Sequence, residues 1–449
     1  MPVSESVTVI GGGLAGTEAA WQLGRHGVRV RLIEMRPATS SPAHSTGGLA
    51  ELVCSNSFKG TDPSSATGTL KQELERLGSV VLAIARRTAV PAGAALAADR
   101  AAFTATLTDM LESHPLIEVL REEATLVPAG RSILATGPLT SPAMETALSE
   151  LVGSDRLAFY DAAAPIVDAA TIDRSVVFAA SRYGKGGGAD YLNCPLDRER
   201  YEAFITELRA ARRVLSHEFE RTDLFQACQP IEEVARSGPD AARFGALKPV
   251  GLTDPNTGER PWAVVQLRPE NAAGTAYNLV GFQTNLAFGE QRRVFGMIPG
   301  LTAAEFLRYG VMHRNTFIDA PSLLDSTLAL RSAPHLRVAG QLTGTEGYLE
   351  AAGSGLLAAL NTVADLTGTP PVVLPPTTAL GALIAYATNP ATVGYQPMHV
   401  NWGLVPPLDP PVRGKRSRYA AYAARAADDI SVWASEHPLC GHRQGSVER

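Results

Sequence analysis

The chain of 449 residues is 45% hydrophobic and 19% charged, a composition typical of globular proteins and not of disordered or fibrous ones. Its length favours two or three domains over a single core. The formal net charge of −5 excludes a strong overall attraction to nucleic acid, so any contact with RNA must come from local basic surface.

Targeting signals and the cysteine spacing indicate the cellular compartment and the roles open to the cysteines. No basic leader precedes an apolar signal core, and no run of about 18 apolar residues could span a bilayer, so we expect a cytoplasmic protein without a membrane partner. The four cysteines, Cys54, Cys194, Cys228 and Cys440, are far apart and lack C-x-x-C spacing. This spacing argues against a metal site or a disulfide scaffold, and it leaves free thiols available for chemistry.

The first predicted element is a strand, turn, helix and strand that carries a glycine fingerprint. A β-branched run feeds Gly11, Gly13 and Gly16, whose G-x-G-x-x-G spacing allows a tight turn and close approach of the backbone to a pyrophosphate. Residues 14–26 suit a helix whose N-terminal N–H groups face the phosphates. Glu34 ends the second strand, where a carboxylate accepts hydrogen bonds from the adenosine ribose of NAD or FAD.

The next elements return the chain to the same sheet. The Ser-, Thr-, Pro- and Gly-rich loop 36–69 is too long for a simple connection, and loops of this length are usually functional or disordered. Helical spacing then follows at 70–77 and at 99–111. The segment 131–138 reads as a strand that runs into a glycine turn at Gly137.

From about residue 166 the sequence pattern changes. Polar turns now separate β-rich runs, and 262–267 and 277–282 are two of these runs. The pattern of the first domain resumes with a strand at 336–340 and a helix at 349–362. The N-terminus of that helix stabilises negative charge, which suits the N1 and O2 side of a reduced flavin better than a nicotinamide.

We therefore predict an α/β fold: a Rossmann-like FAD-binding domain, residues 1–165 and 320–449, with an inserted α+β substrate domain at 166–319. The residues expected to contact the cofactor are Gly11, Gly12, Gly13, Leu14, Ala15, Gly16, Glu34, Arg36, Gly137, Gly340 and Gly347. Local basic surface for RNA is offered by Arg182, Lys185, Arg292, Arg293, Arg413, Lys415, Arg416 and Arg418, which could equally be ordinary solvated side chains.

Several motifs together resemble one enzyme family. They are the segments 10–20, 32–37, 51–57, 190–195, 248–252, 309–316 and 401–407. The chain resembles the folate- and FAD-dependent tRNA (uracil-5-)-methyltransferases of the TrmFO type over nearly its whole length. The early motifs are shared with the longer GidA-type tRNA-modifying flavoproteins, whereas 51–57 and 401–407 discriminate between the two groups.

The resemblance implies methylation of a T-loop uridine, uridine 54 of tRNA, to 5-methyluridine. It implies 5,10-methylenetetrahydrofolate as carbon donor, a methylene carried on flavin N5, and NADPH or NADH as reductant. Uracil C5 is a poor nucleophile until a thiolate adds at C6. The family match assigns this attack to Cys228 and places Cys54 beside the flavin as a base or reversible adduct, although the two roles could be exchanged.

The remaining candidate residues could serve either a functional or a purely structural role. His313 and Tyr348 are aromatic candidates for stacking the pterin, and Arg314 could pair with a folate carboxylate. His44 could approach the pyrophosphate or be an ordinary loop residue, and Trp402 is expected in the core. We expect Cys194 to be structural.

Three rival functions are compatible with the same motifs. A GidA-like enzyme would act on an anticodon wobble uridine, and a flavin-bound RNA-binding protein would assist tRNA folding. A plain NAD(P)H oxidase would leave the thiols and basic clusters without a role. The sequence does not fix the oligomeric state.

Overall fold

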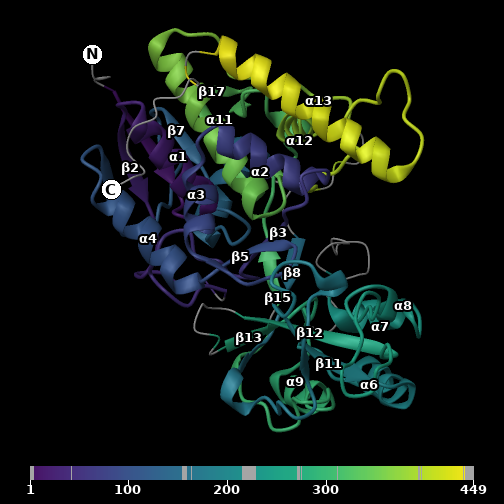
Figure 1. The fold of residues 1–449 in the computed structure, drawn as a ribbon. Helices are drawn as coiled ribbons and strands as arrows, with labels where there is room; N and C mark the ends of the chain where they lie inside the picture. The colour runs from purple at the N-terminus through teal and green to yellow at the C-terminus, as the bar shows by residue number, and fades with distance from the viewer. Residues whose placement is uncertain are drawn as a thin grey trace.

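A computed structural model describes residues 5–437 and 439, apart from 42, 154–158, 163, 215–228, 270–273, 275, 311, 393–394 and 396. At 159–162 and 312–315 only the backbone is described. Figure 1 shows a large upper part that contains the first and last segments of the chain and a smaller lower part formed by its middle.

The upper part is built on a six-stranded sheet in which the strands from β17 to β6 run parallel and only the edge strand β16 is antiparallel. Its order is β16 (Ala329–Leu330), β17 (Ala333–Val338), β7 (Ser132–Leu134), β1 (Ser6–Ile10), β2 (Arg29–Ile33) and β6 (Ile117–Leu120). Parallel strands need crossover helices, which explains the alternating strand and helix pattern of the sequence.

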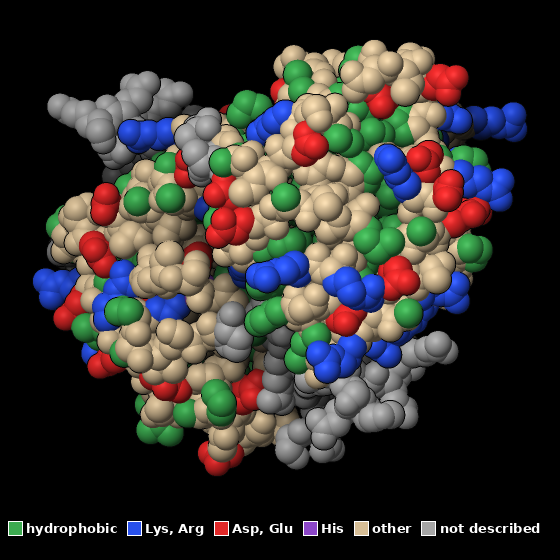
Figure 2. All heavy atoms as spheres, turned by 90° about the horizontal axis from the view of Figure 1, so that it is seen from below, with side chains coloured by type: hydrophobic (Ala, Val, Ile, Leu, Met, Phe, Trp, Pro, Cys, Tyr) green, Lys and Arg blue, Asp and Glu red, His purple; other side chains and the backbone are tan. Residues whose placement is uncertain are grey.

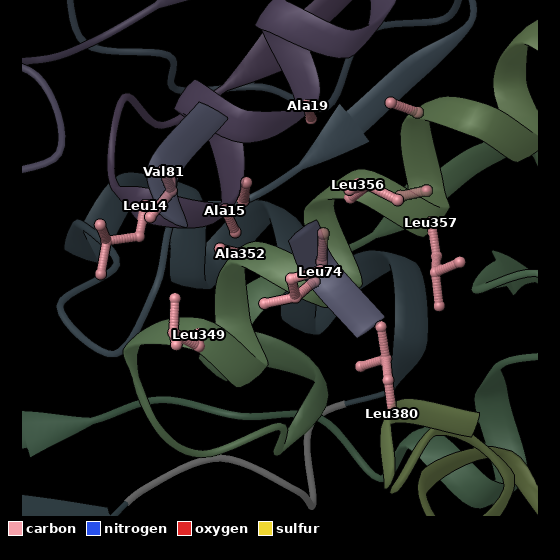
Figure 3. Close-up of a cluster of buried hydrophobic side chains, with 14 of the residues drawn as sticks. Leu14, Ala15, Ala19, Leu74, Val81, Leu349, Ala352, Leu356, Leu357 and Leu380 are labelled. Carbon is pink, nitrogen blue, oxygen red and sulfur yellow. The ribbon is translucent and has the colours of Figure 1, made fainter. Parts of the chain in front are cut away.

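Helices α1 (Leu14–Arg25) and α11 (Tyr348–Thr367) form the centre of this part. Figure 3 shows Ala15 and Ala19 of α1 near Ala352 and Leu356 of α11, with Leu74 and Leu380 from two further helices, α2 (Ala66–Arg76) and α12 (Ala379–Thr388). A Cβ at Gly355 would lie 2.1 Å from the Ala15 carbonyl oxygen. The small residues therefore let the two helices approach closely enough to share one core.

This part also contains the small three-stranded sheet β3 (Ser57–Gly60), β5 (Ala95–Ala98) and β4 (Ala89–Val90), together with further helices. They are α3 (Val80–Arg87), α4 (Arg100–Glu112), α5 (Pro142–Val152), α10 (Ala320–Leu323) and α13 (Lys415–Glu436). The helices expected at 70–77, 99–111 and 349–362 are present within a few residues. Helix α2 begins early because Ser65 accepts the Gly68 N–H and caps it.

The lower part is built on a second, antiparallel sheet with its own buried core. The sheet order is β10 (Phe178–Ala179), β11 (Leu192–Leu196), β12 (Ala263–Pro269), β13 (Ala276–Leu279), β9 (Ile166–Asp168) and β14 (Phe306–Arg308). Helices α6 (Arg198–Ala210), α7 (Ile231–Ser237), α8 (Ala241–Phe244) and α9 (Phe288–Phe295) pack beside it. Cys194 of β11 is fully buried, as its structural interpretation requires.

A two-stranded ribbon connects the two parts. Strand β8 (Phe159–Ala162) pairs antiparallel with β15 (Met312–Asn315), where the chain enters and leaves the lower part (Figure 1). We refer to the lower part as the inserted domain.

Two buried carboxylates tie helices that are far apart in sequence. Glu73 of α2 accepts the N–H groups of Ala379 and Leu380 at 2.7 and 2.9 Å, and so caps α12. Glu18 of α1 accepts the Ser79 hydroxyl at 2.7 Å and thereby holds the start of α3. Burial raises the pKa of Glu73 to about 7, although the two backbone N–H groups oppose this shift.

Candidate functional site

A pocket with about 1250 Å³ of empty space, open solvent included, lies at the carboxyl ends of the parallel strands β1, β2, β7 and β17. This is where ligands bind in open α/β sheets. Among the residues expected at the cofactor or the reacting centre, those that line it are Gly11, Gly13, Leu14, Ala15, Glu34, Arg36, Cys54, Gly137, Gly340, Gly347 and Tyr348.

Each glycine of the fingerprint is needed for a different physical reason. Gly11 has a φ of +99°, and a Cβ there would lie 2.4 Å from the Ala135 carbonyl oxygen. A Cβ at Gly16 would lie 1.8 Å from the Gly11 carbonyl oxygen, so this residue allows the helix to pack on the turn. At Gly13 a Cβ would meet no atom within 4 Å. Gly13 therefore keeps space free in the pocket for a ligand.

Glu34 stands at the end of β2 in a buried network. Its carboxylate accepts the Gly12 N–H at 2.7 Å and Nε of Arg36 at 2.7 Å. Arg36, only 2% exposed, also pairs with Glu51 at 3.2 Å. Burial opposes ionisation of Glu34, but the hydrogen bonds and charge of Arg36 hold the pKa of its carboxyl below the usual value. The carboxylate is thus charged and fixed in position, as a ribose acceptor needs to be.

Two helix N-termini face the pocket without a side-chain cap. The N-cap residues are Gly13 for α1 and Gly347 for α11, and neither accepts an N–H through a side chain. Glu350 in the first turn of α11 is paired with Lys59 at 2.8 Å. The first-turn N–H groups are therefore available to a ligand with negative charge. A cavity with the open Gly13 face and two such helix ends fits a flavin dinucleotide.

Cys54 lies half-buried at the pocket beside Tyr348. The Tyr348 hydroxyl accepts the N–H groups of Cys54 and Ser55, each at 3.0 Å, and donates to the Ser55 carbonyl at 2.8 Å. Its ring packs edge-on against Phe58. Burial, and then the neighbouring Cys54 sulfur, raise the pKa of the Tyr348 phenol well above its usual range, so the phenol stays protonated.

Cations that the sequence does not indicate lie near this thiol. Arg308 donates to the Ala43 carbonyl at 3.1 Å and lies within the electrostatic reach of Cys54, and Arg100 donates to the adjacent Val53 carbonyl at 3.4 Å. Burial lowers the pKa of His44 to about 4, so its imidazole is neutral at pH 7, and its Nδ1 lies 2.6 Å from Ser41 Oγ. Arg308 directly precedes a recognised motif, but no local pattern points it towards Cys54.

For the other expected residues, the structure describes only the backbone, gives no description, or places them away from the pocket lining. Cys228 lies outside the described residues. His313 and Arg314 belong to β15, where their backbone pairs with β8, but their side chains are not among those described. Gly12 and Gly16 support the turn and do not line the pocket. Trp402 is 7% exposed and stacks on Tyr422, which agrees with a core position.

The basic clusters divide into engaged and exposed side chains. Arg182 donates to Gln266 and to the Val250 carbonyl, and Arg293 pairs with Glu207 and Glu290. Lys185, Lys415, Arg416 and Arg418 are exposed, as is Arg293 despite its ion pairs. Figure 2, which views the molecule from the end of the inserted domain, shows Lys and Arg side chains grouped near the centre of this face among acidic ones.

In the described part of the chain, no cluster of three or more His, Cys, Asp or Glu side chains could hold a metal ion. Across the same residues, every helix is too short or too polar to cross a membrane.

Comparison with known proteins places the chain among tRNA-modifying flavoproteins. Residues 6–370 match the family described as glucose inhibited division protein A. The methylenetetrahydrofolate–tRNA-(uracil-5-)-methyltransferase TrmFO of Moorella thermoacetica is 53% identical over 441 residues, which are 98% of this chain and all of that protein. The TrmFO of Geobacter sulfurreducens is 55% identical over 429 residues, or 95% of this chain and 98% of that protein.

Solved structures agree on the fold. Two crystal forms of Aquifex aeolicus GidA superpose with TM-scores of 0.69 and 0.70 over 98% of this chain, covering 74% and 76% of the GidA chain at 18% identity. The predicted α/β fold with a Rossmann-like FAD-binding domain is confirmed. The chain belongs to the glucose inhibited division protein A family and, within it, to the TrmFO methyltransferases.

Proposed function

We propose that this chain is a folate- and FAD-dependent tRNA (uracil-5-)-methyltransferase that forms 5-methyluridine at uridine 54 of the T-loop. Uracil, 5,10-methylenetetrahydrofolate, NADPH or NADH and one proton would give 5-methyluracil, tetrahydrofolate and the oxidised nicotinamide. The observation that carries the proposal is the pocket in which the glycine fingerprint, the charged Glu34, two uncapped helix ends and the Cys54 thiol meet.

The pocket residues would bind FAD along the length of the cavity. We assign the adenosine ribose to Glu34, the pyrophosphate to the N-terminus of α1 at Gly11–Ala15, and the flavin ring to the region of Gly137, Gly340 and Gly347. When bound, FAD would carry the one-carbon unit and the hydride between folate, nicotinamide and uracil. The N–H groups of α11 would favour negative charge on the reduced ring.

The thiols of Cys228 and Cys54 would act as nucleophile and base. Addition of the Cys228 thiolate to C6 of uracil would make C5 nucleophilic, and its later elimination would restore the ring. Cys54 lies at the pocket, where it would remove the C5 proton after the new bond forms. Arg308 and Arg100 would favour the Cys54 thiolate, and Tyr348 would hold its loop.

Folate would enter from the side of β15. We propose that His313 stacks on the pterin and that Arg314 pairs with the glutamate carboxylate. Tyr348 was expected to stack on the pterin, but the structure supports another role for it, since its hydroxyl is hydrogen-bonded to the Cys54 loop. It would contact folate only through its ring edge.

A surface shared by the two domains would bind the tRNA elbow. Hydrogen bonds from Ser64 lower the pKa of Asp62, and the nearby cations Lys185 and Arg416 lower it further. Lys185 belongs to the inserted domain and Arg416 to α13, so cations from two segments distant in sequence act on the same carboxylate. Such convergence gives a negatively charged protein a local site for phosphates.

The decisive experiment is incubation with unmodified tRNA transcript, methylenetetrahydrofolate and NADPH, followed by digestion and mass analysis of the nucleosides. Folate-dependent 5-methyluridine in the T-loop fragment is expected. A matched transcript with cytidine at the target position should give none. Mass gain in an anticodon fragment, or NADPH consumption without modified nucleoside, would overturn the proposal in favour of a wobble-uridine enzyme or an oxidase.

A further inference from the structure

Three aromatic side chains of the inserted domain are stacked into a ladder that ends at the surface. The Phe306 and Tyr309 rings lie 5.3 Å apart with an interplanar angle of 11°, and the Tyr309 and Phe288 rings lie 4.9 Å apart at 16°. Phe288, the first residue of α9, is 52% exposed. Since one of its faces is covered by Tyr309, much of its exposed surface belongs to the other face and the edge.

The ladder is rigid because it is anchored in the core. Phe306 contacts the Phe295 ring, which packs on Phe282 at 5.4 Å between ring centroids. Gln291, fully buried, donates to the Gly310 carbonyl at 2.7 Å and accepts the Gly310 N–H at 2.8 Å. These bonds fix the turn after Tyr309 against α9. An exposed ring held this firmly loses little conformational entropy when a ligand stacks on it.

The position of the ladder connects it to the pocket. Arg308, between Phe306 and Tyr309, reaches the Ala43 carbonyl, and Ala43 lines the pocket. On the outer side, the exposed Arg292 donates to the Tyr309 hydroxyl at 3.1 Å, so a cation stands beside the stack. Aromatic rings with an adjacent arginine are the arrangement on which unpaired nucleic-acid bases stack.

We propose that Phe288, supported by Tyr309 and Phe306, is a stacking platform for an unpaired base of the RNA substrate, with Arg292 placed for the adjoining phosphate. The inference rests on the proposed action on tRNA and extends it to a positioning residue. Stacking tolerates any base, so the platform would hold a loop nucleotide in place without reading its identity. It would act on binding and orientation and not on the chemical step.

The test compares three substitutions at one position. Phe288→Ala removes the ring, Phe288→Leu keeps an apolar side chain, and Phe288→Trp keeps stacking. Affinity is measured for a T-arm hairpin and for a blunt RNA duplex without unpaired bases. We expect the Ala and Leu variants to bind the hairpin about ten-fold more weakly and the Trp variant to stay within about two-fold of wild type. Duplex affinity and the slope of affinity against salt should not change, because no phosphate contact is lost.

A matched control is Phe244→Ala, which removes a ring that is 75% exposed in the same domain. It should leave hairpin binding unchanged, and flavin content and melting temperature should stay constant in all variants. Wild-type affinity in Phe288→Ala would overturn the inference, as would a changed oligomeric state or a raised KM for folate alone. If wild-type protein neither binds nor methylates the hairpin, the proposed function itself fails.

Discussion

The Tyr348 hydroxyl accepts the backbone N–H of Cys54 at 3.0 Å, although 294 residues separate the two in sequence. Tyr348 is the first residue of α11, whose N-terminus faces the pocket, and Cys54 sits in the long loop after β2. One phenol therefore sets the position of the thiol relative to the helix end. The relationship shows how a loop of this length stays ordered at a reacting centre.

Replacing Tyr348 by Phe should slow methylation without releasing FAD. The change leaves the packing on Phe58 but removes three hydrogen bonds to the Cys54 loop, each worth about 1 kcal/mol. We expect kcat to fall about ten-fold or more and iodoacetamide to alkylate Cys54 faster. Tyr191→Phe, which loses one bond to the Ala92 carbonyl, is the control. Equal losses in both variants would assign the effect to general loosening.

The two cysteines should separate in their effects. Cys228→Ala should abolish methyl transfer while the yellow cofactor stays bound, because addition to C6 has no substitute nucleophile. Cys54→Ala should also lose turnover but should accumulate a covalent RNA adduct through Cys228, which Cys228→Ala cannot form, because elimination from C6 needs removal of the C5 proton. A fully active Cys228→Ala protein would remove its assigned role, and exchanged phenotypes would exchange the roles.

Substitution of Gly13 should remove FAD without unfolding the protein. A side chain at Gly13 meets no protein atom within 4 Å, so Gly13→Leu fills only the ligand space. Gly16→Ala, in contrast, places a methyl group 1.8 Å from the Gly11 carbonyl oxygen and should lower the melting temperature. Flavin absorbance and thermal unfolding measure both effects. Stoichiometric flavin in Gly13→Leu would contradict the assignment of the pyrophosphate site.

The sequence predicts the features that depend on local spacing. The fingerprint turn, the acid at the end of β2 and the helix that starts at the second glycine turn all follow from periodicity and turn chemistry. Features that depend on distant partners escape it. Glu73 caps a helix 306 residues away, and Arg308 approaches Cys54 from another domain. No pattern within a window of the chain records either pairing.

The pH dependence of stability should reveal the buried Glu73. Its carboxyl pKa is raised to about 7 in the fold from a usual value of 4.5, so the folded state holds a proton that the unfolded state releases. Stability is therefore fully present below pH 4.5 and is lost as the pH rises to about 7, by up to about 3 kcal/mol.

Glu73→Gln does not titrate, and its stability relative to wild type should increase over the same range. Urea unfolding between pH 4.5 and 8 measures the difference. A constant offset between the two proteins at every pH would contradict the raised pKa.

The salt dependence of tRNA affinity should count the phosphates held where the two domains meet. Lys185 and Arg416 come from different domains, but both lower the pKa of Asp62. If each neutralises one phosphate, Lys185→Ala and Arg416→Ala should each reduce the slope of log affinity against log salt by about 0.9, and the double variant by the sum. Arg31→Ala, an exposed residue of β2, is the control and should leave the slope unchanged. The two changes in slope should add because the two cations would hold different phosphates. A double variant whose slope is no lower than that of either single variant would mean that both cations bind the same phosphate.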